Sequence, residues 1–139
     1  MRRLFIMRKD LQMSPGKMAA QVGHCAEVYW LKQMNRTGIF HHQVQMVAHI
    51  DEDIYEDYIH GNIVKTICEA KNKNHLLKAK TVAEELALKE NEDFGLIKDK
   101  CFTELTPEEE DGTTITGIWF KPLPDDVAHI ISKKYQLYK

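Results

Sequence analysis

Short apolar runs alternate with longer amphipathic stretches along this chain of 139 residues, which predicts strands that alternate with helices. Residues 3–8 form an apolar run bounded by charge, and we expect a buried strand there. Ser14 is a good N-cap and Pro15 suits a first helical position, so a helix should begin here and continue to about Met34. Small side chains recur along this helix and would let it lie close to a sheet.

The later pattern predicts a further series of elements and one α/β domain over residues 1–139. In chain order these are a strand within 38–50, a short acidic helix over 51–60 ended by Gly61-Asn62, a strand over 63–69, a helix capped by Asn74, a strand over 94–97 that leads into Asp99, a strand over 114–120 and a last helix over 126–132. This order favours a mixed, mostly parallel β-sheet of about four strands with helices packed on both faces.

Composition narrows the class of protein. Hydrophobic residues make up 43% of the chain and charged residues 29%, which suits one domain with a proper core and excludes a chain that is disordered throughout. No apolar run approaches the roughly 18–20 residues of a membrane span. The apolar part of the basic start is shorter than a signal-peptide core of ~7–15 residues. We therefore expect a cytoplasmic protein without a membrane partner.

Charge is distributed unevenly along the chain. The net charge is −2, which argues against a uniformly basic nucleic-acid binder. Residues 1–36, however, hold seven basic and two acidic side chains. Residues 51–60 hold five acidic and no basic side chains, and residues 90–112 hold nine acidic and two basic ones. The basic N-terminal segment can therefore meet an acidic partner, and the acidic run 106–112 is expected to be a solvated loop.

Neither the cysteines nor the histidines form a metal-binding pattern. Cys25, Cys68 and Cys101 are widely spaced without a C-x-x-C motif, which fits free thiols in a reducing compartment. The seven histidines include no H-E-x-x-H motif and no partners for a Cys/His quartet. We expect no metal site.

The densest candidate chemistry lies at the start of the first predicted helix. Lys17, Gln21 and His24 stand at positions i, i+4 and i+7 and so share one helix face. Lys17 falls in the first turn, where the helix dipole disfavours a cation, and its presence there suggests an anion or a developing oxyanion nearby. A solvated lysine beside a hydrogen-bonding glutamine is the other interpretation of the same spacing.

This stretch resembles the signature of a known family. Its residues read Arg8-Lys9-Asp10-Leu11-x-Met13-x-x-Gly16-Lys17-x-Ala19-Ala20-Gln21-x-x-His24. They are similar to the opening strand, loop and helix of the type 2 peptidyl-tRNA hydrolase family. A weaker similarity to the same family continues through residues 65–70, 96–105, 113–124 and 135–138.

The resemblance implies an enzyme and a set of site residues. The reaction would be hydrolysis of the ester that joins a peptide, or an N-blocked aminoacyl group, to the 3′ end of tRNA, with release of free tRNA and without a metal or cofactor. The partner would be tRNA, and the protein would be a homodimer. The implied catalytic residues are Lys17, His24, Asp99 and Thr103. The implied substrate-binding residues are Gln21, Arg8, Lys9 and Lys100.

These residue types suit the implied reaction. Ester hydrolysis needs a positioned and deprotonated water and a stabilised oxyanion. In this scheme Asp99 orients the water and Lys17 stabilises the oxyanion, while His24 and Thr103 hold the substrate or tune Asp99. A carboxylate that caps a loop is the other interpretation of Asp99.

Departures from the family pattern leave other functions open. Lys100-Cys101-Phe102 stands where the family has Ala-Gly-Arg, which removes a glycine from a turn and an arginine from the expected tRNA side. The acidic residues 108–111 replace a short Pro-Gly turn and would repel phosphate if they faced the substrate. A segment around 38–61 looks inserted.

Three alternatives follow from these departures and from the residues near the signature. The chain could be a catalytically altered tRNA-binding, protein-binding or regulatory protein on the same fold. It could also hydrolyse another small ester or amide. A nucleophilic Cys25 beside His24 is a minor variant, because consecutive helix positions point apart.

Overall fold

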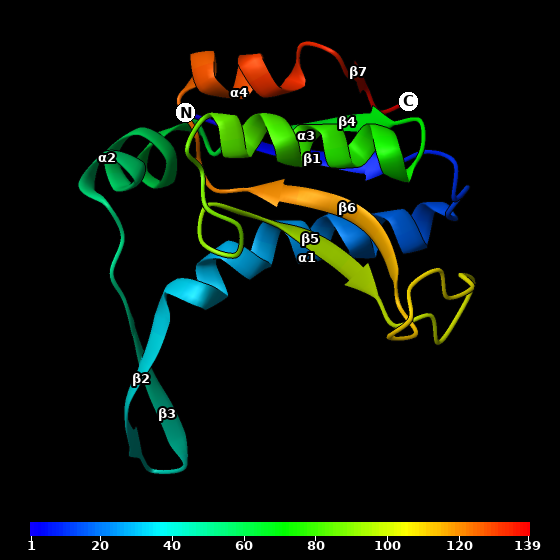
Figure 1. Ribbon diagram of the computed structural model, residues 1–139. Helices are drawn as coiled ribbons and strands as arrows, with labels where there is room; N and C mark the ends of the chain where they lie inside the picture. Colours follow the sequence, from blue (N-terminus) through cyan, green and yellow to red (C-terminus); the bar gives the residue numbers. More distant parts are fainter.

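A five-stranded sheet forms the centre of the protein (Figure 1). The computed structural model describes residues 1–139, and the strand order in the sheet is β5-β6-β1-β4-β7. The strands of this sheet are β1 (Arg3–Arg8), β4 (Lys65–Ala70), β5 (Phe94–Asp99), β6 (Thr114–Phe120) and β7 (Gln136–Leu137). The predicted class, an α/β domain with a mixed sheet, is confirmed, although there are five strands rather than about four.

Most strand pairings are antiparallel, and the expectation of a mostly parallel sheet is wrong. Only β1 and β4 pair in parallel, whereas the pairs β1–β6, β5–β6 and β4–β7 are antiparallel. The connection from β5 to β6, residues 100–113, contains no helix. A parallel neighbour needs a long crossover, usually a helix, so this connection brings the chain back antiparallel.

Helices cover both faces of the sheet, as expected. The three long helices are α1 (Pro15–Gln33), α3 (Lys73–Glu85) and α4 (Asp125–Ser132). Helix α1 lies on one face, and α3 and α4 lie on the other (Figure 1). The central strand β1 contributes to both cores, because Leu4 and Ile6 join the apolar cluster of α3 and α4 while Phe5 and Met7 join that of α1. No helix of the structure combines the length and the apolar character that a membrane crossing requires.

The helix starts follow local capping rules. The Lys17 main-chain N–H donates to Ser14 Oγ at 3.3 Å, so Ser14 caps α1 as predicted. Helix α3 begins two residues earlier than expected. Its cap is Asn72 rather than Asn74, and Asn72 Oδ1 accepts from the His75 N–H at 2.8 Å. Both asparagines are good caps, so the local sequence does not separate them.

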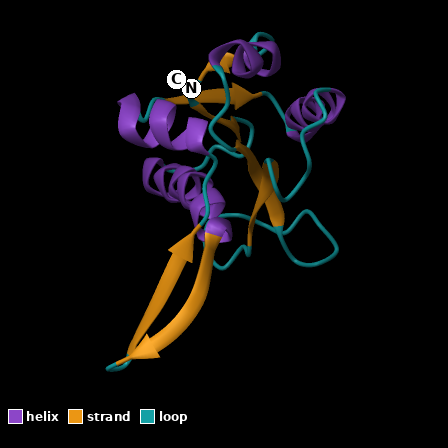
Figure 2. Ribbon diagram, turned by 90° about the vertical axis from the view of Figure 1, so that its left-hand side faces the viewer, coloured by secondary structure: helices purple, strands orange, loops and turns teal.

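The strand expected within 38–50 is present as β3 (Gln43–Ala48). It forms a hairpin with β2 (Met34–Phe40), which was not expected, and this hairpin projects from the domain (Figure 2). The two strands pair only with each other. His41 and His42 connect them with φ values of 49° and 64°, the two positive values that a type I′ turn requires. Asn-Gly or Asp-Gly is the usual sequence for this turn, so the two histidines did not predict it. That this segment is an insertion stays a prediction.

The carboxyl edge of the sheet, where β1, β4 and β5 end, joins segments that are far apart in the chain. Asp99 ends β5 and lies in register with Thr114 at the start of β6, while Arg8 ends β1 and Ala70 ends β4. This edge therefore collects residues of the family-like signature and of the later segments.

The acidic helix expected over 51–60 is present, but it lies away from the carboxyl edge of the sheet. It consists of α2 (Glu52–Ile54) and the π-helix η1 (Tyr55–Asn62), and Gly61 has non-helical angles as expected. The buried side chains of Ile54 and Tyr58 fix it to the core. Because it immediately precedes β4, it lies at the edge opposite the carboxyl edge. Its carboxylates are thus kept away from Asp99.

Candidate active site

Asp99 is the centre of the candidate site. Its Oδ1 accepts hydrogen bonds from Lys17 Nζ at 2.8 Å and from Gln21 Nε2 at 3.4 Å, and its Oδ2 accepts from the Cys101 main-chain N–H at 3.0 Å. The side chains of Lys17 and Asp99 are 14% and 11% exposed, so the ion pair is largely shielded but still reaches solvent. Three donors surround the carboxylate, so both of its oxygens accept hydrogen bonds.

Gln21 is held in place by β6. Its side chain is 2% exposed, and its Oε1 accepts a 2.6 Å hydrogen bond from the hydroxyl of the buried Thr116. Because an amide has one acceptor end and one donor end, this contact turns Gln21 Nε2 toward Asp99. Gln21 therefore positions the Asp99 carboxylate from the buried side of the site.

Cys101 adopts the left-handed backbone conformation, with φ of 61°. The family pattern has glycine at this position, and glycine takes a positive φ at the least cost. This chain adopts the left-handed conformation here although it lacks a glycine, and the Cys101 N–H donates to Asp99 Oδ2. The departure at 100–102 is thus compatible with a main-chain hydrogen bond to the Asp99 carboxylate.

Glu104 ties the loop after β5 to the first turn of α1. Its carboxylate accepts hydrogen bonds from the Ser14 main-chain N–H at 3.0 Å and from the Ser14 hydroxyl. The hydroxyl bond from Ser14 lowers the pKa of Glu104 from its ordinary value, and Lys17 adds a smaller effect in the same direction. This contact keeps residues 100–104 next to the Lys17–Asp99 pair.

Most carboxylates of the acidic run 106–112 are paired with basic side chains of the domain. Glu108 pairs with Arg8 at 2.6 Å, Asp111 pairs with Lys98 at 3.5 Å, and Glu109 pairs with Lys73. The run is the largely exposed loop that was expected, but much of its negative charge is offset by these lysine and arginine partners.

Arg8 is buried and forms its contacts within the protein. Its side chain is 3% exposed, and besides Glu108 it pairs with Asp10 at 2.8 Å and donates to the Ile115 main-chain oxygen at 3.0 Å. These partners fix the loop over the end of β1. The resemblance implied that Arg8 binds substrate, and in the structure its buried guanidinium is occupied by these partners.

The other predicted site residues lie around the Asp99 cluster without joining it. His24 is exposed one turn beyond Gln21 on α1, and Thr103 is exposed in the loop after β5. Lys100 is exposed next to Asp99 in the chain. Lys9 follows β1, where its Nζ donates to the Lys139 main-chain oxygen and lies 4.4 Å from the ring centroid of Tyr138. The structure thus joins Lys17, Gln21 and Asp99 and leaves these four side chains at the margin.

Sequence reasoning missed three groups that act on the site. They are the Thr116 hydroxyl, the Cys101 main-chain N–H and the Glu104 carboxylate. Threonines inside a buried strand were the one available signal, but Thr114 and Thr116 both fit it, so it did not single out Thr116. Nothing in the local sequence pairs Glu104 with Ser14.

The three cysteines are free thiols, as expected. Burial raises the pKa of Cys25 to about 12, so its thiol is neither ionised nor accessible at neutral pH. The variant with a Cys25 nucleophile is therefore wrong. No group of three or more His, Cys, Asp or Glu side chains is arranged to hold a metal ion.

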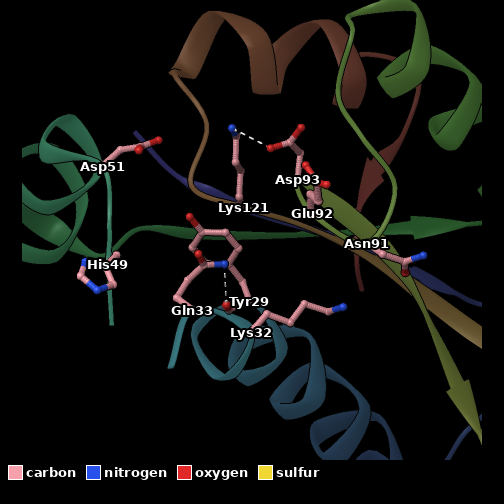
Figure 3. A pocket seen from close by; sticks show the side chains of 9 residues that line it. All are labelled: Tyr29, Lys32, Gln33, His49, Asp51, Asn91, Glu92, Asp93 and Lys121. Atoms are coloured by element: carbon pink, nitrogen blue, oxygen red, sulfur yellow. Dashed lines mark hydrogen bonds and ion pairs between the residues drawn. The ribbon is translucent and has the colours of Figure 1, made fainter. Parts of the chain in front are cut away.

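A separate polar cavity of about 540 Å³ lies at the far end of α1 (Figure 3). Both signs of charge line it, and its Lys121 pairs with Asp93 at 2.9 Å. Tyr29 and Gln33 reach it from α1, and His49 and Asp51 reach it from the segment after the hairpin. None of the predicted catalytic residues lines this cavity, so the candidate site stays at the carboxyl edge.

Comparison with known proteins identifies the family. The family model described as Peptidyl-tRNA hydrolase PTH2 matches residues 1–138. The chain belongs to this family. A relative named peptidyl-tRNA hydrolase from Thermococcus onnurineus is 27% identical over 136 residues, which cover 98% of this chain and 96% of the relative. One of the same name from Thermoplasma acidophilum is 25% identical over 131 residues, covering 94% and 92%. The resemblance is confirmed, and the identities mark a divergent PTH2 member.

Among solved structures, the PTH2 chain is similar to Atu0240, a protein of unknown function from Agrobacterium tumefaciens strain C58. The TM-score is 0.56 over 99% of this chain and 97% of that chain, at 8% identity. This likeness concerns the fold alone.

The Asp99 cluster of this PTH2 member combines the groups that an ester hydrolysis requires. The carboxylate is an acceptor for a water proton, and the Lys17 ammonium 2.8 Å away is a cation for a developing oxyanion. Gln21 and Cys101 hold the carboxylate from the protein side.

Proposed function

We propose that this protein hydrolyses the ester between a peptide, or an N-blocked aminoacyl group, and tRNA, and so releases free tRNA. The observation that carries the proposal is the 2.8 Å Lys17–Asp99 pair at the solvent-facing edge of a chain that the PTH2 family model matches over residues 1–138. A carboxylate beside a cation supplies both the base and the oxyanion partner of acyl transfer to water.

In the proposed reaction Asp99 is the general base. A water held by its carboxylate gives a proton to Asp99 while the water oxygen forms a bond to the ester carbonyl carbon. The resulting oxyanion lies against Lys17. The intermediate then breaks its bond to the 3′ oxygen of tRNA, and the proton on Asp99 passes to that departing oxygen. Gln21 and Cys101 keep the carboxylate oriented through both steps.

The predicted site residues that lie around the Asp99 cluster have supporting roles in this proposal. His24 and Thr103 are exposed on the two segments that flank the Lys17–Asp99 pair, so they are positioned for contact with the substrate. Lys9 and Lys100 are exposed cations at the carboxyl edge and suit phosphate groups. Arg8 holds the acidic loop in place and does not contact the substrate.

We further propose that the protein acts in the cytoplasm as a homodimer. The three free thiols suit a reducing compartment. Support for a dimer comes from exposed apolar side chains near the end of α1 and before β4, among them Leu31, Met34 and Val64. Light scattering on the purified protein tests this part, and a monomer at micromolar concentration would contradict it.

Incubation with N-acetyl-aminoacyl-tRNA tests the reaction. We expect release of free tRNA and the N-acetyl amino acid. Lys17→Ala should lower kcat by about 10²–10³-fold, because it removes the cation from the oxyanion. Lys32→Ala removes the same charge from the other end of α1 and is the matched control, with kcat expected to be unchanged. Equal rates in the two variants would contradict the role of Lys17, and tRNA binding without cleavage by the unaltered protein would contradict the reaction.

A further inference from the structure

A groove beside the candidate site shares only Lys9 with the residues to which a role is given above. It lies at the carboxyl edge, where β1, β4 and β7 adjoin, and it has a volume of about 540 Å³. Three lysines reach it from separate segments: Lys9 follows β1, Lys71 follows β4 and Lys134 precedes β7. Lys71 and Lys134 belong to no ion pair of the structure, whereas Lys9 Nζ donates to the oxygen of Lys139. The groove therefore holds two ammonium groups that pair with no side-chain carboxylate.

The carboxylates of the groove do not offset these cations. Asp10 lines it but is paired with Arg8 at 2.8 Å. Glu69 also lines it and forms no ion pair, so one unpaired side-chain carboxylate stands against the two unpaired ammonium groups of Lys71 and Lys134. The acidic segment 51–62 lies at the opposite edge of the sheet. The local field at the groove is thus positive although the chain as a whole carries a net charge of −2.

His75 also lines the groove. Its Nδ1 accepts from the Lys71 main-chain N–H at 2.9 Å, so Nε2 is the ring nitrogen that is left to donate. The ring stacks on Tyr135 at 4.4 Å between centroids, so its orientation is set by the protein. Ammonium groups beside an ordered ring N–H match phosphate oxygens beside ribose hydroxyls.

The distance from the groove to Asp99 can be spanned by a few nucleotides. Strands lie about 4.8 Å apart, so three spacings separate β5 from β4 and four separate it from β7, or roughly 14 and 19 Å. A stacked nucleic-acid strand rising ~3.4 Å per residue covers that distance in roughly four to six residues. A strand with its 3′ end at Asp99 can therefore run along the same edge into the groove.

We propose that this groove binds the sugar–phosphate backbone of the nucleotides that precede the 3′-terminal ester. Lys71 and Lys134 contact phosphate oxygens together with Lys9, and His75 donates to the backbone between them. This assignment rests on the proposed function, since it takes the 3′ end to lie at Asp99. It directs the tRNA from Asp99 across β1 toward β4 and β7, away from the projecting hairpin.

The test compares two double variants that remove the same charge. Lys71→Ala with Lys134→Ala empties the groove of two cations, and Lys32→Ala with Lys89→Ala removes two exposed lysines elsewhere. Both are assayed on N-acetyl-aminoacyl-tRNA and on the same N-acetyl-aminoacyl ester of adenosine alone. The groove variant should raise KM for the tRNA substrate roughly three- to thirtyfold, with kcat unchanged and with no effect on the adenosine ester. The control variant should stay within about twofold of the unaltered protein.

Salt dependence and direct binding complete the test. Loss of two phosphate contacts should flatten the slope of log KM against log salt by about two, whereas the control variant keeps the original slope. Fluorescence anisotropy with deacylated tRNA should give the same difference in Kd without any need for turnover. If both double variants cleave the substrate with identical KM and salt slope, the proposed role of the groove is contradicted, whereas the proposed reaction is supported. Weaker tRNA binding by the groove variant, in a protein that cleaves no ester, would support the groove and overturn the reaction.

Discussion

Replacing Thr116 by valine tests whether β6 positions the catalytic carboxylate through Gln21. The substitution removes one hydroxyl from the core and keeps the branched shape of the side chain. That hydroxyl donates to Gln21 Oε1 at 2.6 Å, and Gln21 is 2% exposed, so water cannot replace the lost donor. A buried acceptor left unpaired costs about 1–3 kcal/mol of unfolding free energy.

A double-mutant cycle isolates this contact. Gln21→Met leaves the Thr116 hydroxyl able to donate to the Ile97 main-chain oxygen, which is 3.4 Å away, so no buried donor is orphaned. The combination of both substitutions removes acceptor and donor together and leaves neither unpaired. The summed cost of the two single variants should therefore exceed the cost of the double variant by about 1 kcal/mol or more.

Urea unfolding followed by circular dichroism measures these free energies, and cleavage of N-acetyl-aminoacyl-tRNA measures the catalytic effect. Thr116→Val should lower kcat about tenfold, equivalent to ~1.4 kcal/mol, because Asp99 loses an oriented donor, while KM stays the same. Thr116→Ser keeps a hydroxyl and should restore kcat. Single-variant costs that add within about 0.3–0.5 kcal/mol would refute the coupling, and an unchanged kcat would refute the positioning role.

Three further predictions concern stability and the loop beside the site. Arg3 is fully buried and donates to the main-chain oxygens of Phe120 at 2.6 Å and Cys25 at 2.9 Å, so Arg3→Ala should lower the unfolding free energy in urea by about 3 kcal/mol or more, and a loss below about 1 kcal/mol would contradict this account. The hydrogen bond from the Ser14 hydroxyl lowers the pKa of Glu104, so this contact is fully present above the ordinary pKa of 4.5 and is lost as pH falls through the lower pKa of the folded state. The NMR chemical shift of the Ser14 amide should therefore titrate with a midpoint below 4.5. A midpoint at or above 4.5 would count against the contact. Replacing residues 35–47 by a short Asn-Gly turn should leave the thermal midpoint within about 4 °C, because the hairpin pairs only with itself, and a larger fall would reveal a contribution to the core.

Local pattern predicted the elements of this fold well where one segment carries the whole signal. The run over β1 is apolar at consecutive positions because Leu4 and Phe5 face different cores, and Ser14 before Pro15 marked the start of α1 correctly. The direction of β6 was not predictable in the same way, because it depends on whether a connection forms a crossover helix. The hairpin turn was hidden for a different reason, since His41 and His42 take a conformation that Asn and Gly usually adopt.

In the candidate site, too, the residues with a local sequence signal were predicted and the contacts between distant segments were not. Lys17, Gln21 and Asp99 were reached through the helical spacing and the family resemblance, and the structure joins them. The contacts that hold them connect residues 95 positions apart for Thr116 and Gln21, and 90 positions apart for Glu104 and Ser14. Such pairs carry no local pattern, because their proximity comes from the order of strands in the sheet.

Charge gave the least reliable expectation. The acidic run 106–112 is a largely exposed loop, as expected, but three of its carboxylates pair with Arg8, Lys73 and Lys98, so it carries less unpaired negative charge than the sequence count suggested. Conversely, Arg3 and Arg8 count toward the basic N-terminal segment and yet are buried. Charges counted along a sequence therefore misstate the field at the surface until their partners are known.

The central claim is that Asp99 activates water for cleavage of a tRNA ester, and one measurement addresses it directly. The single-turnover rate of N-acetyl-aminoacyl-tRNA cleavage is compared between the unaltered protein, Asp99→Asn and the exposed control Asp126→Asn. Asp99→Asn should lower the rate by about 10²–10⁴-fold, the usual contribution of a general base, while tRNA binding persists and the control keeps full activity. Cleavage by Asp99→Asn within about threefold of the unaltered rate, well below the contribution of a general base, would contradict the account.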